Sequence, residues 1–167
     1  MKKLYIFVAS LFITSTIIFA AEGSSTTDSD TIKFQSMDGE SFEINEIVKS
    51  GQNVALVFWQ TWCSVCKREA PQVVEASKTH GDKIRFFGVI SGSDEDVDDK
   101  KVEKLAKKLE LPYPQVRDRD LMLTQRYEVK GTPTIVIIGK DLMPVYNSHK
   151  LPSDWTAYYP SLIADSK

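Results

Sequence analysis

The chain has 167 residues, of which 42% are hydrophobic and 26% are charged. This length is enough for one domain with a buried core and too short for two ordinary domains. The formal net charge is only -2 at pH 7, and so weak a field gives no support to nucleic-acid binding. We therefore expect one globular domain without a nucleic-acid partner.

The first 21 residues have the layout of a secretory signal. Lys2 and Lys3 form a short basic start, and residues 4–21 carry no charge, are mostly apolar and end in Phe19-Ala20-Ala21. A basic start, an apolar middle and small residues at the end are typical of a signal peptide. An uncleaved membrane anchor is the alternative, because the apolar stretch is near the lower length limit for spanning a bilayer. We predict that residues 1–21 are a signal peptide or membrane anchor, and that the protein is periplasmic or lies at the outer face of the cytoplasmic membrane.

The segment that follows predicts a linker and then a hairpin. Residues 22–30 are rich in Ser, Thr and Asp and show no apolar periodicity, which is typical of a flexible linker. Two alternating runs, 31–35 and 41–44, flank Asp38-Gly39. An Asp-Gly pair between such runs favours a β-hairpin.

The rest of the chain alternates between buried strands and helices. Residues 54–59 are continuously apolar, as in a strand covered on both faces, and a helix containing Pro71 follows over 64–79. This order predicts a layered α/β domain with a mixed sheet over residues 31–167. The further elements that we expect are a short helix at 46–50, a strand at 84–90, a helix through 102–109, an extended piece at 113–117, a short helix at 121–127, strands at 134–138 and 143–148, and a final helix at 153–164 with a break at Pro160.

The chain contains two cysteines, Cys63 and Cys66, at the start of the predicted helix. Unpaired backbone N–H groups and the helix dipole favour a thiolate there, which makes Cys63 the predicted nucleophile. Cys66 lies about one turn further on and can resolve a mixed disulfide held on Cys63. A bridge this short restrains the unfolded chain very little, so redox chemistry explains the pair better than stability does.

Three other roles for the cysteine pair are weaker. A metal site needs two more ligands, and the only histidines, His80 and His149, lack partner spacing. Haem attachment needs a histidine directly after the second cysteine, where Lys67 stands. An inert structural bridge is the third. We expect no metal and no cofactor other than the redox-active disulfide.

At these residues the sequence resembles the thioredoxin superfamily. The motif runs from Val57 through Trp59 to Cys63-Ser64-Val65-Cys66-Lys67, and Gly131-Thr132-Pro133-Thr134 follows far downstream. The resemblance implies a thioredoxin fold, with a central mixed β-sheet flanked by helices. It also implies that Pro133 is cis and faces the cysteine pair, leaving the backbone of Thr132 free to pair with an extended client peptide. A trans proline that only starts a strand is the alternative.

More narrowly, the chain resembles the extracytoplasmic branch that includes TlpA, ResA and CcmG. The export signal, the N-terminal hairpin, a central helical insertion over residues 94–116 and the run Cys66-Lys-Arg-Glu-Ala-Pro71 carry this resemblance. Thioredoxin itself has a buried Asp where this chain has Val57. Glu69 lies on nearly the same helical face as Cys66, and the resemblance implies that it serves as the base of that thiol. An ordinary solvated acid paired with a lysine is the alternative for Glu69.

Trp62 is interpreted either as an exposed contact for partners or as packing against the helix. The branch resemblance implies a monomeric reductase of oxidised client proteins, with apocytochrome c as the leading candidate and a membrane thiol transporter as electron donor. The alternatives are a disulfide oxidase or isomerase, and a non-catalytic binding module on the same fold. The two residues between the cysteines, Ser64 and Val65, do not settle the direction of electron flow.

Overall fold

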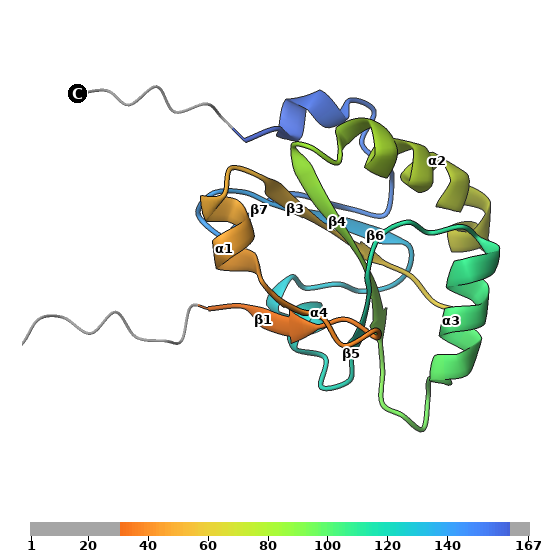
Figure 1. Ribbon diagram of the computed structural model, residues 1–167. Helices are drawn as coiled ribbons and strands as arrows, with labels where there is room; N and C mark the ends of the chain where they lie inside the picture. Colours follow the sequence, from red (N-terminus) through yellow and green to blue (C-terminus); the bar gives the residue numbers. More distant parts are fainter. Residues whose placement is uncertain (1–30, 161–167) are drawn as a thin grey trace, which may run out of the picture.

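The computed structural model of the chain describes residues 31–160 (Figure 1). The predicted signal or anchor (1–21) and the predicted linker (22–30) lie outside the described residues. Five strands form the main sheet in the order β5-β4-β3-β6-β7. β3, β4 and β5 run parallel, and β6 and β7 are antiparallel to their neighbours, which confirms the predicted mixed sheet. The strands span β3 Asn53–Phe58, β4 Ile84–Ser91, β5 Gln115–Asp118, β6 Thr134–Ile138 and β7 Pro144–Ser148.

Helices cover both faces of this sheet (Figure 1). The long helix α2 lies on one face with the C-terminal 3-10 turn η2, and α1 and α4 lie on the other. α2 continues through Pro71, which it tolerates inside the helix. The helical elements are α1 Ile44–Lys49, α2 Ser64–His80, α3 Asp99–Lys108, α4 Met122–Arg126 and η2 Trp155–Tyr158.

The continuous apolar run of β3 supplies both faces of the sheet. Because successive side chains of a strand point to opposite faces, Val54, Leu56 and Phe58 enter the core under α1 and α4. Ala55 and Val57 enter the core under α2 and η2. Every residue of β3 is buried, as expected for a central strand covered by helices.

The predicted hairpin is present as β1 Lys33–Gln35 and β2 Ser41–Glu43. It forms a two-stranded sheet of its own and meets the main sheet at the edge strand β5. Ser36 bridges Val116 there, and the Met37 N–H donates to the Gln115 carbonyl over 2.7 Å. Phe34 and Phe42 of the hairpin pack edge-on against Phe87 of β4.

The central insertion consists of α3 and β5. Asp98 caps the start of α3, with its carboxylate accepting the backbone N–H groups of Lys100 and Lys101. Val102 and Ala106 of α3 pack with both cysteines in one apolar cluster. The insertion therefore forms one wall of the cysteine site as well as adding an edge strand to the sheet.

The predicted final helix over 153–164 is wrong within the described residues. The chain makes only the short turn η2, and Tyr159 then takes an extended conformation with φ -69° and ψ 149°. The following residue is Pro160, and a proline disfavours the helical conformation of the residue before it. Residues 161–164 of that prediction lie outside the described residues.

No helix within residues 31–160 is long and apolar enough to cross a membrane.

Candidate active site

Cys63 and Cys66 are joined by a disulfide at the start of α2. Cys63 is the N-cap residue of that helix, and its Sγ accepts the backbone N–H of Cys66 over 3.1 Å. A sulfur in this position meets the free N–H groups and the positive end of the helix dipole, which favour the thiolate. The exposed fractions of the two residues are 5% for Cys63 and 7% for Cys66. In the disulfide form, exposure therefore does not single out the nucleophile, and the N-cap position of Cys63 carries the assignment.

Trp59, the last residue of the apolar run, is held in place by two hydrogen bonds and so fixes the segment that leads to Cys63. Its backbone N–H donates to the Val89 carbonyl of β4, and its ring Nε1 donates to Gln115 Oε1 over 2.9 Å. The Gln115 side chain lies over Gly88, where a Cβ atom would come within 2.2 Å of Gln115 Oε1. A glycine at position 88 thus leaves room for the amide that holds Trp59.

A small cavity lies directly beside Cys66 and brings together residues that are far apart in the sequence. Its volume is about 20 Å³, which leaves room for at most about one water molecule. Most of its wall is apolar. The residues that line it are Val57, Trp59, Cys66, Glu69, Ala70, Val73, Leu109, Leu111, Tyr113, Pro133, Ile135 and Leu151.

Among residues 31–160, Glu69 is the only carboxyl residue that lines this cavity. It is half-buried, one helical turn after Cys66, and its carboxylate makes no hydrogen bond or ion pair with any other residue of the range 31–160. The alternative of an acid paired with a lysine therefore has no support in the described part of the chain. Tyr113 also lines the cavity, but burial raises its pKa, so its hydroxyl stays neutral and Glu69 is left as the candidate proton acceptor for Cys66.

The Thr132–Pro133 peptide bond is cis, as predicted, and Pro133 lines the cavity with Cys66. The hydroxyl of Thr132 is buried and has no hydrogen-bond partner among residues 31–160. Of the two predicted substrate-binding residues, Pro133 thus shares a cavity with Cys66, and Thr132 precedes it in the loop before β6.

His149, the residue directly after β7, supports this loop through a contact that the sequence did not predict. Its Nδ1 lies 2.7 Å from the Pro133 carbonyl oxygen and 3.0 Å from Thr134 Oγ1. A carbonyl can only accept, so Nδ1 carries the hydrogen, and Thr134 Oγ1, which donates to the Gly131 carbonyl, accepts as well. A histidine that looked isolated in the sequence therefore orders the proline loop.

Trp62 precedes Cys63 and has 74% of its surface exposed. This exposure contradicts the alternative in which the ring packs against the helix. A large aromatic side chain in water next to a reactive cysteine is a ready contact surface for another protein. Trp59, by contrast, is core.

The comparison with known proteins identifies the family. The model of the AhpC/TSA family matches residues 28–143. The chain belongs to this family. A thioredoxin-like protein of Haemophilus influenzae is 26% identical over 152 residues, covering 91% of this chain and 86% of the relative. The thiol–disulfide oxidoreductase ResA of Bacillus cereus is 30% identical over 106 residues, covering 63% of this chain and 58% of the relative.

Solved structures agree on the fold. A secreted Mycobacterium tuberculosis disulfide oxidoreductase homologous to E. coli DsbE superposes with a TM-score of 0.60 at 21% identity, covering 73% of this chain and 84% of that one. The thioredoxin fold and the resemblance to the ResA branch are therefore confirmed. With a disulfide at the Cys63–Cys66 motif, the protein is a thiol–disulfide oxidoreductase.

Proposed function

We propose that the protein is exported and reduces disulfides in extracytoplasmic client proteins. The observation that carries the chemical part is the placement of Cys63 as N-cap of α2, with Cys66, Glu69 and cis Pro133 around one cavity. The relative named ResA, a thiol–disulfide oxidoreductase, supports the same chemistry.

The reaction follows from this geometry in two exchanges. In the reduced protein, the Cys63 thiolate attacks one sulfur of the client disulfide, and the other client sulfur leaves as a thiolate. The Cys66 thiol then loses its proton to Glu69 and attacks Cys63 Sγ. The second client sulfur leaves and is protonated. Two electrons have passed to the client, and the protein carries the Cys63–Cys66 disulfide.

The client would lie across Trp62 and the proline loop. The exposed ring of Trp62 offers an apolar contact beside the attacked sulfur. The backbone of Thr132 offers main-chain pairing to an extended peptide, as in other cases where a peptide adds to a strand edge. An oxidised CxxCH pair of apocytochrome c is the leading candidate client, and a membrane thiol transporter is the proposed electron donor.

Export is proposed from the N-terminal pattern. Lys2 and Lys3 precede an uncharged apolar stretch that ends in small residues. The similar disulfide oxidoreductase of Mycobacterium tuberculosis is a secreted protein, which supports this proposal. Cell fractionation of the full chain, with mass spectrometry of the purified product, tests it. Accumulation in the cytoplasm would contradict export, and the measured mass reports whether residues 1–21 are removed.

The reduction potential of the Cys63–Cys66 couple tests the direction of electron flow. The protein is equilibrated with glutathione buffers and the disulfide fraction is measured by thiol labelling. A reductase is expected near the thioredoxin value of about −270 mV, and a strong oxidase near about −120 mV. A value near the oxidase end would replace the reductase proposal with the oxidase. In parallel, reduction of a disulfide-bonded peptide with a CxxCH pair tests the client class against a matched peptide without the histidine.

A further inference from the structure

Gln60 occupies the junction between β3 and the cysteine motif, and it is 8% exposed. Its side-chain Nε2 donates to the Ser91 carbonyl at the end of β4 over 2.6 Å. Its own backbone carbonyl accepts the N–H of Cys63 over 3.1 Å. The second bond closes a four-residue turn whose third residue is the exposed Trp62. Gln60 is therefore the buried, tethered end of the turn that presents both Trp62 and Cys63.

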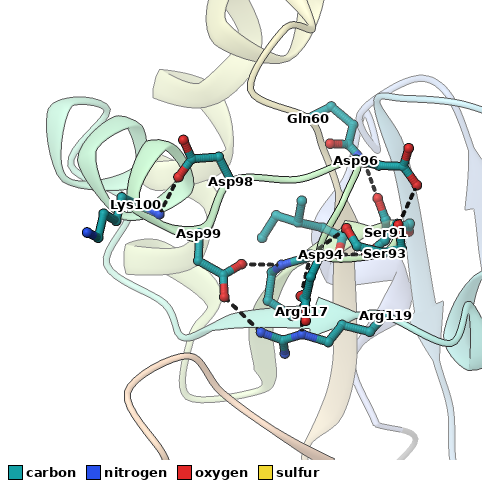
Figure 2. A network of polar contacts seen from close by, with 12 residues as sticks. Gln60, Ser91, Ser93, Asp94, Asp96, Asp98, Asp99, Lys100, Arg117 and Arg119 are labelled. Atoms are coloured by element: carbon teal, nitrogen blue, oxygen red, sulfur yellow. Dashed lines mark hydrogen bonds and ion pairs between the residues drawn. The ribbon is translucent and has the colours of Figure 1, made fainter.

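The segment that contains the acceptor of this hydrogen bond, the Ser91 carbonyl, is held in place by several side chains (Figure 2). The Arg117 guanidinium donates to the carbonyl groups of Ile90 and Gly92, the two neighbours of Ser91, over 2.9 and 3.0 Å. The Ser91 hydroxyl is hydrogen-bonded to Thr124 Oγ1 at 2.6 Å. The last two residues of β4 and Gly92 after them are thus fixed by side chains from other elements, so the Ser91 carbonyl is a rigid point of attachment.

The charged groups around this point are mostly engaged with one another. Arg117 is buried and paired with Asp99, and the exposed Arg119 is paired with Asp94 and Asp99. Figure 2 shows these pairs beneath the loop that carries Asp94 and Asp96, with Gln60 and Ser91 beside it. The network joins α3 and β5 to the end of β4, and Gln60 ties the cysteine motif to the same point through the Ser91 carbonyl.

We propose that Gln60 is a positioning residue for thiol–disulfide exchange, which holds Cys63 at the N-terminus of α2 through its bond to Ser91. Cys63 Sγ accepts the N–H of Cys66 at 3.1 Å, and stabilisation of a thiolate by helix-end N–H groups is confined to this first turn. A turn released from Ser91 lets Cys63 drift from that position. The inference concerns exchange at Cys63 and does not depend on the direction of electron flow or on export.

The experiment removes the donor and keeps the volume of the side chain. Gln60→Met is made in the Cys66→Ala background, where Cys63 is the only thiol of the chain. The alkylation rate of Cys63 is measured against pH, and the reduction potential is measured in the variant that retains both cysteines. The alkylation rate at pH 7 is expected to fall by about two- to fivefold, with the profile displaced to higher pH, because less thiolate is present. The potential is expected to move to a more reducing value.

Asn53 provides the matched control at the opposite end of β3. It is also buried, and its Nδ2 donates to the Tyr158 carbonyl over 2.8 Å. Asn53→Leu should lower the melting temperature to a similar extent and leave the Cys63 pH profile and the potential unchanged. If Gln60→Met only lowers the melting temperature, or if Asn53→Leu moves the profile equally, the positioning role is wrong. Should Gln60→Met fail to fold, Gln60→Asn, which is one methylene too short to keep the tether, is judged by the same two outcomes.

Discussion

Glu69 and Val57 line the same small cavity beside Cys66. Val57 stands where thioredoxin has its buried acid, and Glu69 reaches the cavity from α2 instead of from β3. Glu69 therefore brings to this cavity a carboxyl group that Val57 does not supply. This relationship supports the proposal that Glu69 takes the proton of Cys66.

Replacing Glu69 by Gln keeps the shape of the side chain and removes its titration. We expect Glu69→Gln to slow client reduction by about 100-fold, the low end of what a positioned base contributes. The pH dependence of Cys66 alkylation should change as well, while the circular dichroism spectrum stays the same. The measurement is thiol alkylation against pH in the Cys63→Ala background, with client reduction followed in parallel in the protein that retains both cysteines.

Glu75 is a suitable control for this experiment. It lies on the same helix, is exposed and does not line the cavity. Glu75→Gln should behave like the unmodified protein in both measurements. Superimposable pH curves for the Glu69 and Glu75 variants would return Glu69 to the role of an ordinary helix acid.

The order of attack is tested by trapping. Without a resolving thiol the mixed disulfide persists, so Cys66→Ala should accumulate client adducts on Cys63. Cys63→Ala should accumulate few, because the helix-end N–H groups that favour a thiolate meet the N-cap residue Cys63, and Cys66 itself supplies one of them. Non-reducing gels followed by mass spectrometry identify the adducts. Since exposed fractions do not distinguish the two cysteines in the disulfide, adducts on Cys66 instead would mean that the N-cap argument is wrong.

The parts of this site that the sequence predicted are local or carried by a motif. Cys63 and Cys66 follow an apolar strand, and Gly131-Thr132-Pro133 precedes another, so their positions could be inferred from the order of elements and from the resemblance. Gln60 and His149 could not. Their contacts join residues 31 and 16 positions apart, and a single side-chain hydrogen bond between distant segments leaves no periodic signal.

The prediction of a final helix over 153–164 was wrong for a related reason. Apolar and aromatic residues over 153–164 suggested a helix, but Trp155 is buried against Phe86 and stacked beside His80 of α2. Packing of individual aromatic rings decides this segment, and Pro160 limits the helix locally. Periodicity reports neither effect, because tertiary contacts override local preference in a segment this short.

The exposed ring of Trp62 should matter for clients and not for stability. Trp62→Ala is expected to slow the reduction of a protein client about tenfold, corresponding to about 1.4 kcal/mol of lost contact. Its reaction with a small dithiol and its melting temperature should change little, because an exposed side chain contributes little to folding. Met143→Ala is the control, since Met143 is 65% exposed and precedes β7. Equal slowing with protein and small-molecule substrates would contradict a client-contact role.

Arg117 and Arg119 pair with the same two aspartates, Asp94 and Asp99, from different environments. The Arg117 side chain is 1% exposed and the Arg119 side chain 49%. Arg117 also donates to three backbone carbonyl groups, those of Ile90, Gly92 and Ser93. Lysine keeps the charge of arginine but has no planar fork to reach several acceptors at once.

We therefore expect Arg117→Lys to lower the free energy of unfolding by about 2 kcal/mol, because buried carbonyl groups lose their donors. Arg119→Lys should change it by less than about 0.5 kcal/mol, as is usual for an exposed ion pair. Urea unfolding followed by tryptophan fluorescence and by circular dichroism measures both variants. Arg117 also holds the two neighbours of Ser91. Arg117→Lys should therefore lower the alkylation rate of Cys63 at pH 7, as Gln60→Met does. If the two lysine variants lose the same free energy of unfolding, the buried hydrogen bonds of Arg117 are not what stabilises the end of β4.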